Sequence, residues 1–286
     1  MKTIILFLIM AGLFTGFSSA SSTHYQEPEN INKKDRYGET YLMNLSRDGR
    51  IAEMKNAISK GADVKIRTKY NLDAVVYAAM NGKEEAVKLL CNSGVDKNKV
   101  DISYVIIWGD SKLAELLVDL GCNPNYKGYT DVAPLLPAIR SGNNDLFMKL
   151  VEKGADLSVR GGDGSTALHT VIQNKNNTQI QFVLKQNIDV NLKNNDSLVA
   201  LHFAAENRDY KLMQQLIDLG ADVNAKDKNN ATTAFRAALF NDIEMMKLLI
   251  NNKADLTIES KWGTPLEYAL KRKNKEMIKL IKNKVK

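Results

Sequence analysis

The chain alternates short apolar segments of helical period with polar stretches, and this alternation recurs at a fixed interval. In residues 201–227, apolar positions three and four apart indicate two short helices, and the tail Gly-Ala-Asp-Val-Asn follows them at 220–224. A glycine in this place suits the left-handed residue that ends a helix. Near copies of the tail begin at residues 61, 94, 121, 154, 187 and 253, so from residue 61 the steps are 33, 27, 33, 33, 33 and 33. A period of this length predicts one elongated array of stacked helix pairs.

The start of each unit carries a family resemblance. Thr166–His169 reads Thr-Ala-Leu-His, residues 199–205 read Val-Ala-Leu-His-Phe-Ala-Ala, and 264–266 read Thr-Pro-Leu. With the tails, these segments resemble the ankyrin repeat, whose pattern runs T-P-L-H-x-A-A and ends in G-A-D-V-N. The resemblance implies an all-α solenoid of about eight helix-turn-helix repeats joined by short β-hairpin loops. We expect the repeats at about 35–66, 67–98, 99–125, 126–158, 159–191, 192–224, 225–257 and 258–286.

The first 20 residues have the layout of a secretory signal peptide. Lys2 supplies the positive start, residues 4–17 are apolar, and Ser18-Ser19-Ala20 places small residues before a cut after Ala20. This apolar run is shorter than the about 20 residues of a membrane span, and an uncleaved anchor is the alternative. We predict an exported protein, periplasmic or secreted, with a composition rich in Lys, Asn and Ile that looks bacterial. Residues 21–34 are predicted to be a flexible leader.

One loop between repeats is short. Between Gly94 and the next first helix, six residues are missing relative to the neighbouring repeats. We therefore predict a truncated finger between repeats two and three, and a notch that exposes the helix behind it. Such a notch is a candidate binding place, although short loops are also tolerated as ordinary variation.

The chain offers few residues for catalysis. Its three histidines are His24 in the leader and His169 and His202 at the same repeat position. The resemblance implies that His169 and His202 tie the finger to the helix, and a ligand or base role is the alternative. HExxH, CxxC and phosphate-binding glycine motifs do not occur, and Gly161–Gly164 falls in a finger. We predict no catalytic site, no cofactor and no metal site.

Cys91 and Cys122 are the two thiols of the chain. In repeat register they lie near the ends of neighbouring outer helices. Packed helices lie about 10 Å apart, whereas a disulfide needs Cα atoms within about 7 Å. We expect free buried thiols, with a disulfide as the alternative that export would allow.

The resemblance implies a concave binding face made of finger tips and first helices. Apolar and arginine side chains in its outward positions form two clusters, which we predict to contact a partner because Trp, Tyr and Arg dominate interface energies. The alternative is that some of them pack beneath neighbouring repeats. The first cluster contains Tyr77, Met80, Tyr104, Ile107, Trp108 and Arg140, and the second contains Phe203, Arg236, Leu239 and Phe240.

Charge adds one alternative partner. The chain has 40 Lys and Arg against 33 Asp and Glu, a net charge of +7, and the densest basic run is 271–275. Because the charges are otherwise interspersed, we predict a scaffold that binds an unidentified protein and no nucleic acid. We also expect this scaffold to be a monomer and to have no stable membrane insertion after signal cleavage. The alternatives are an anionic polymer or membrane surface bound through the basic C-terminal repeat, and a His-dependent enzyme.

Overall fold

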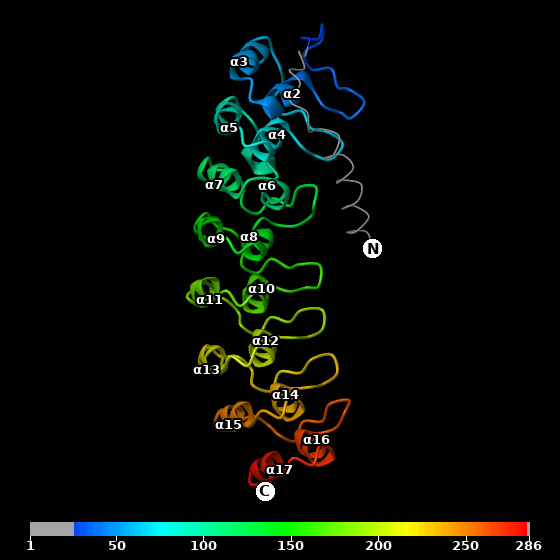
Figure 1. The fold of residues 1–286 in the computed structure, drawn as a ribbon, viewed down its shortest axis with the longest axis vertical. Helices are drawn as coiled ribbons and strands as arrows, with labels where there is room; N and C mark the ends of the chain where they lie inside the picture. The colour runs from blue at the N-terminus through cyan, green and yellow to red at the C-terminus, as the bar shows by residue number, and fades with distance from the viewer. Residues whose placement is uncertain (1–25, 285–286) are drawn as a thin grey trace.

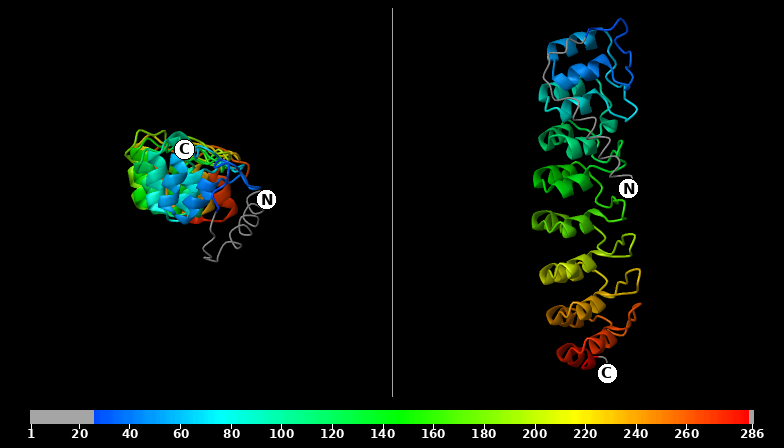
Figure 2. Two further views of the ribbon diagram at one scale, coloured as in Figure 1. Left: turned by 90° about the horizontal axis from the view of Figure 1, so that it is seen from above. Right: turned by 45° about the vertical axis from the view of Figure 1, so that its right-hand side comes forward.

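The computed structural model describes residues 26–284, and the predicted signal segment lies outside them. Eight helix pairs make up this described part and stack in a single row (Figure 1). Figure 2 shows that the helices form two layers, with the connecting loops projecting to one side. The predicted all-α repeat solenoid is confirmed. Over residues 26–284 no helix is long and apolar enough to cross a membrane.

The first helix of each pair is here called inner and the second outer. The inner helices are α2 (Tyr41–Asp48), α4 (Ala74–Met80), α6 (Ile102–Trp108), α8 (Leu135–Ser141), α10 (Ala167–Gln173), α12 (Ala200–Glu206), α14 (Thr233–Leu239) and α16 (Pro265–Lys271). The outer helices are α3 (Ile51–Ser59), α5 (Glu84–Asn92), α7 (Ser111–Asp119), α9 (Asn144–Glu152), α11 (Asn177–Leu184), α13 (Tyr210–Asp218), α15 (Ile243–Asn251) and α17 (Lys275–Lys282). A 3-10 turn, η1 (Lys97–Lys99), precedes α6.

Capping side chains start most of these helices, and packing between repeats keeps them folded. The Asp73 carboxylate accepts from the Val76 N–H at 3.1 Å, and the Asp209 carboxylate accepts from the Leu212 N–H at 2.9 Å. Helices of seven to nine residues are marginal alone in water. Small residues such as Ala78 and Ala205 are fully buried, which lets neighbouring inner helices approach closely. The helices therefore depend on the adjacent pairs.

An asparagine at the end of several repeat tails ties one repeat to the next. Asn191 donates from its amide to the Gly220 carbonyl at 2.9 Å, and its amide oxygen accepts from the Asp222 N–H at 2.8 Å. One side chain thus satisfies two backbone groups at the exit of the following outer helix. Asn125 makes the same pair of bonds to Gly154 and Asp156.

The same bond pair corrects the prediction of a flexible leader over 21–34. Asn32 donates to the Gly61 carbonyl at 3.0 Å and accepts from the Asp63 N–H at 2.8 Å. Glu27 forms an ion pair with Lys60 at 2.7 Å. The described part of this segment, 26–34, therefore docks on the first repeat because Asn32 acts as the tail asparagine of a preceding unit.

The loop that leads into each inner helix, here called a finger, turns on one left-handed residue. These residues are Gly38, Asn71, Asp131, Gly164, Ser197, Asn230 and Gly263, all with φ between 52° and 99°. They recur every 33 residues except between Asn71 and Asp131, where η1 replaces the finger. The truncated finger is thus observed. In place of the expected β-hairpins, the fingers of the described chain are tight turns with a single isolated β-bridge, Ser260–Gly263.

The left-handed requirement is testable within one finger. Gly164 has φ +75°, and a Cβ there would lie 2.3 Å from the Asn195 side-chain oxygen, whereas a Cβ at Gly162 would meet nothing within 4 Å. We expect Gly164→Ala to lower the free energy of unfolding by about 1–2 kcal/mol or more. Gly162→Ala is the matched control and should change it by less than about 0.5 kcal/mol. Equal effects in urea denaturation would contradict this account of the finger.

Candidate binding surface

The two fingers beside the truncated one meet across the gap. The Tyr70 and Tyr129 rings pack edge to face with centroids 5.4 Å apart, and the Asn71 amide donates to the Tyr126 hydroxyl oxygen at 2.6 Å. Tyr104, on the inner helix behind them, is only 3% exposed. The predictions that the gap exposes this helix and that Tyr104 contacts a partner are therefore wrong.

The rest of the first cluster lies in the middle of α4, as Tyr77, and at the C-terminal ends of α4, α6 and α8. Ile107 is 43% exposed and Arg140 is exposed, whereas Tyr77, Met80 and Trp108 are half-buried. The Tyr77 side chain interacts with other residues of the protein. Its hydroxyl donates to the Glu39 carboxylate at 2.6 Å, and the Arg47 guanidinium lies 4.8 Å from its ring. Burial and this hydrogen bond raise the pKa of the Tyr77 hydroxyl. The accessible part of the cluster is thus centred on Ile107.

Two aromatic residues occupy a position that holds asparagine in other repeats. Asn174 and Asn207, which end α10 and α12, donate to carbonyl oxygens of the preceding inner helix at 3.0 and 2.9 Å. The aligned residues Asn81 and Ser141 are also polar, but α6 and α14 have Trp108 and Phe240 at this position. The Phe240 ring has no N–H group that could make this inter-repeat bond.

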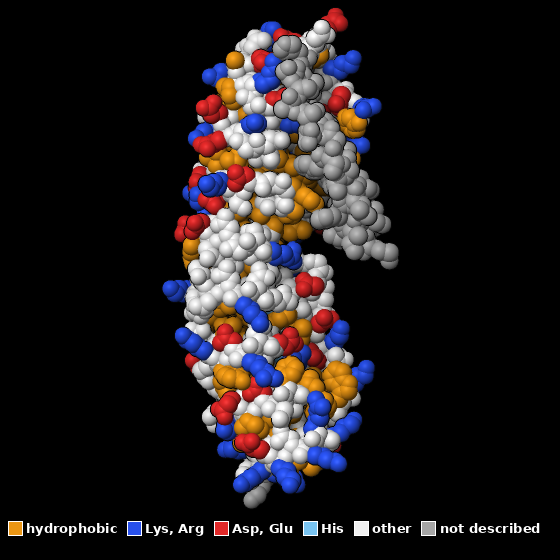
Figure 3. All heavy atoms as spheres, in the orientation of Figure 1, with side chains coloured by type: hydrophobic (Ala, Val, Ile, Leu, Met, Phe, Trp, Pro, Cys, Tyr) orange, Lys and Arg blue, Asp and Glu red, His pale blue; other side chains and the backbone are white. Residues whose placement is uncertain are grey.

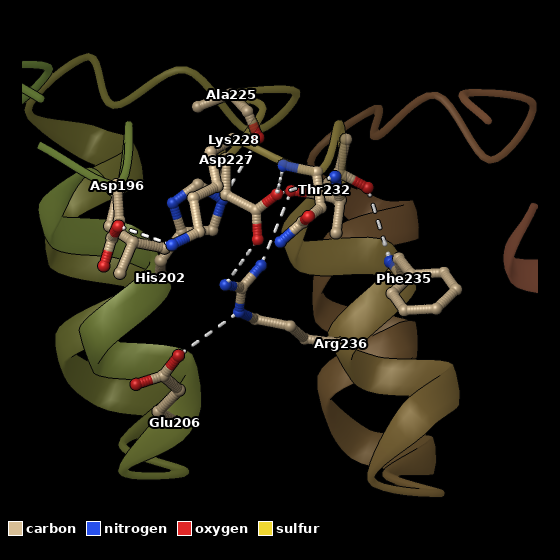
Figure 4. Close-up of polar contacts among 12 residues, drawn as sticks. Asp196, His202, Glu206, Ala225, Asp227, Lys228, Thr232, Phe235 and Arg236 are labelled. Atoms are coloured by element: carbon tan, nitrogen blue, oxygen red, sulfur yellow. Dashed lines mark hydrogen bonds and ion pairs between the residues drawn. The ribbon is translucent and has the colours of Figure 1, made fainter. Parts of the chain in front are cut away.

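Arg236, from the second cluster, holds a finger in place (Figure 4). Its guanidinium forms an ion pair with Asp227 at 2.9 Å, lies 3.4 Å from the Ala231 carbonyl oxygen and reaches Glu206 of α12 at 3.4 Å. Arg236 is only 8% exposed. Its predicted role as a partner contact is wrong, because the side chain joins α14 to its own finger and to the preceding repeat.

The other members of the second cluster differ in accessibility. Phe203 is 6% exposed, and its ring lies 5.2 Å from the His169 ring, so its predicted role as a partner contact is also wrong. Leu239 and Phe240 are half-buried, and the Arg208 guanidinium lies 6.0 Å from the Phe240 ring. Phe240 therefore remains the aromatic candidate in this part of the surface.

The two repeat-register histidines are buried and hydrogen-bonded to backbone. The His202 Nδ1 accepts from the Val199 N–H at 3.1 Å, and its Nε2 donates to the Ala225 carbonyl oxygen at 3.1 Å (Figure 4). The His169 Nδ1 accepts from the Thr166 N–H at 3.0 Å. Burial lowers the pKa of His169 to about 4 and that of His202 to about 3. His202 thus joins its helix to the next finger as a neutral ring, in agreement with the role that the resemblance implies.

Both thiols lie in the core of the array. Cys91 and Cys122 are buried and free. Across residues 26–284, no group of three or more His, Cys, Asp or Glu side chains is placed to hold a metal ion.

An aromatic group at the last finger was missed from the sequence. Trp262 is 52% exposed and stacks on Phe235 with ring centroids 5.8 Å apart, and Tyr268 packs edge to face on the same Phe235 at 5.2 Å. A signal was present, because the residue before the left-handed position is aromatic in three fingers, as Tyr37, Tyr70 and Trp262, and each follows Arg or Lys. Figure 3 shows hydrophobic side chains gathered at two levels of this face, beside α6 and beside α14 to α16.

Comparison with known proteins agrees with this architecture. The family model "Ankyrin repeats (3 copies)" matches residues 7–101, 102–194, 135–227 and 201–286. The chain belongs to the ankyrin repeat family, whose repeats generally mediate protein–protein interaction. The chain is also 27% identical over 119 residues to an ankyrin repeat protein of Acanthamoeba polyphaga mimivirus. That match covers 39% of this chain and 14% of the viral protein.

The low histidine pKa values give a direct test of the structural role. Because both folded-state pKa values lie below the value near 6.5 of an unfolded imidazole, the rings stabilise the fold above pH 6.5. This stabilisation is lost as pH falls from 6.5 toward 4. At pH 5 the loss in the free energy of unfolding is about 2 kcal/mol per ring. We expect the His169 and His202 ring resonances in NMR spectra to show no titration between pH 8 and pH 5. The same rings in urea-unfolded protein should titrate near pH 6.5, and an equal midpoint in folded protein would contradict the structure.

Proposed function

We propose that this chain is an exported, non-catalytic scaffold that binds a protein through the concave face formed by its inner helices and fingers. The observation that carries the proposal is the exposed apolar group at the end of α6, where Ile107 is 43% exposed beside Trp108. Exposed apolar patches with a polar rim are characteristic of partner sites. Arg140, at the same level of the next inner helix, supplies a cationic rim.

The proposed mechanism is rigid presentation. The inner helices pack in register, and the asparagine bonds fix several repeats to their neighbours, so the face exists before a partner arrives. A preformed surface loses little conformational entropy on docking. Trp108 and Phe240 then serve as anchors, because large aromatic side chains contribute most to such interfaces. The absence of catalysis in this proposal is supported by the two histidines, which are buried, neutral and used by the fold.

The C-terminal repeat supports a second candidate, an anionic polymer or membrane surface as the partner. Lys271, Arg272, Lys273 and Lys275 are all exposed, and the Arg272 guanidinium lies 5.7 Å from the Tyr268 ring. Binding of this kind releases counterions, so its affinity falls steeply with salt. A partner held through Ile107 and Trp108 should respond weakly to salt, because apolar contacts are not screened.

The binding face can be tested with matched apolar positions. Ile107 on α6 and Leu219 after the outer helix α13 are 43% and 50% exposed. We expect Ile107→Glu to abolish capture of the native partner from the envelope or secreted fraction, because it buries a charge in the interface. Leu219→Glu is the control and should retain capture, and both variants should melt within about 2 °C of the wild type. Capture that survives Ile107→Glu and Trp108→Ala together would contradict this face as the binding site.

The export part of the proposal rests on the residues of the first segment, from Lys2 to Ala20. When the full chain is expressed in a bacterium, we expect a mature protein that begins at Ser21 in the exported fraction. Mass spectrometry of the intact protein measures this N-terminus. A product that retains Met1 and stays in the cytoplasm would contradict export.

A further inference from the structure

In the regular part of the array, successive finger tips are joined by backbone hydrogen bonds. The Asn195 N–H donates to the Asp163 carbonyl at 3.0 Å, and the Lys228 N–H donates to the Asp196 carbonyl at 2.9 Å. The Lys261 N–H continues the series with the Asn229 carbonyl at 2.9 Å. These bonds join the four successive fingers that turn at Gly164, Ser197, Asn230 and Gly263.

In the part of the chain that the structure describes, no such backbone bond crosses the truncated finger, and a cavity lies there. The finger at 62–73 and the finger at 123–133 are two repeats apart, and side chains join them where the backbone bonds are missing. Beside this side-chain bridge lies a cavity of about 420 Å³, here called the gap cavity. Lys65, Arg67 and Asn71 line it from one finger, Tyr126 lines it from the other, and Asp96 and Lys99 line it from the η1 segment.

The lining has an excess of cationic groups. Three cations, Lys65, Arg67 and Lys99, face one lining carboxylate, Asp96. Asp96 lies 3.7 Å from the Lys99 ammonium, which leaves that charge weakly paired. Within residues 26–284, the Lys65 ammonium forms no ion pair or hydrogen bond that would hold it away from the cavity. The lining thus carries a net positive charge.

The donors of the gap cavity are held in position. The Arg67 guanidinium donates to the Asn71 carbonyl at 2.9 Å and to the buried Asp73 carboxylate at 2.7 Å, which fixes its plane and offsets part of its charge. The Tyr126 hydroxyl oxygen accepts from the Asn71 amide at 2.6 Å. Because that oxygen is the acceptor in this bond, the Tyr126 hydroxyl proton is available to another acceptor.

We propose that the gap cavity binds a small anionic group, a carboxylate or a phosphate. Its volume lies within the range of about 300–1,000 Å³ of small-molecule sites. Its lysine, arginine and hydroxyl donors are those that recognise carboxylate and phosphate oxygens. A free small anion and an acidic side chain of a bound protein share this chemistry. The site is separate from the Ile107 group and does not depend on it.

The test uses two probes on the full mature chain, inorganic phosphate and a tetraglutamate peptide. Titration is followed by the backbone amide resonances of residues 65–71, 96–99 and 126. We expect saturable shifts confined to these residues, and we expect the affinity to fall as salt rises. Tighter binding of phosphate identifies a free anion as the ligand, and tighter binding of the peptide identifies a partner's acidic side chain.

Charge-reversal variants distinguish binding in the gap cavity from nonspecific attraction to the basic surface. We expect Lys65→Glu combined with Lys99→Glu to weaken binding of the better probe at least about tenfold, and Tyr126→Phe to weaken it about threefold. Lys127→Glu is the control, because Lys127 is exposed and adjacent to Tyr126 but does not line the cavity. It should change the affinity less than about twofold.

Unchanged melting temperatures will show that these surface variants fold. Absence of saturable binding by both probes would overturn the proposal, as would equal weakening by Lys127→Glu. Because Ile107→Glu should leave anion binding unaffected, loss of the proposed protein partner and loss of the anion are distinguishable.

Discussion

The constraint on which this structure depends is that each helix pair buries its apolar side only against the pairs before and after it. Helices of seven to nine residues are too short to be stable alone, and no other layer covers them in the described chain. Fully buried alanines, such as Ala78 and Ala205, set the close approach of inner helices. The tail asparagines then satisfy the backbone groups at the ends of the outer helices. Stability in such an array is a sum of terms between neighbours.

This constraint explains why the chain tolerates a missing finger. The six-residue deletion removes a loop and leaves α6 and α7 intact, so the helix core continues through the repeat without a break. Val105 on α6 and Leu117 on α7 remain fully buried. The adjacent fingers close the opening with Tyr70, Tyr129 and the bond from Asn71 to Tyr126. The cost to the core is small, and the space gained is a basic cavity at the surface.

The sequence predicted the architecture well because the repeat period constrains every unit in the same way. The repeat tails and the left-handed finger residues follow a 33-residue period. The truncated finger is visible as a departure from that period. The binding residues were harder to predict. Tyr104, Phe203 and Arg236 were assigned as outward from register alone, but register does not show which side chains a neighbouring finger or repeat covers. Arg236 is buried because Asp227 and Glu206 compensate its charge, and these partners come from different loops and helices.

Trp262 is the opposite case, an exposed aromatic residue that was not predicted to lie on the binding surface. A residue in a finger tip is expected to be polar, and only the column of Tyr37, Tyr70 and Trp262 across distant repeats marks it as unusual. Its stacking on Phe235 depends on the position of α14 against the last finger, which sequence spacing does not specify. Local pattern thus predicts the scaffold, whereas contacts between repeats decide which side chains remain on the surface.

Native-state hydrogen exchange across the truncated finger tests the continuity of the array most directly. If neighbouring pairs stabilise one another through the gap, the amides of α4 and α6 will exchange as slowly as those of α10 and α12. Exchange in α6 that is faster by two orders of magnitude or more, about 3 kcal/mol of lost protection, would show that the array divides there into two independent units.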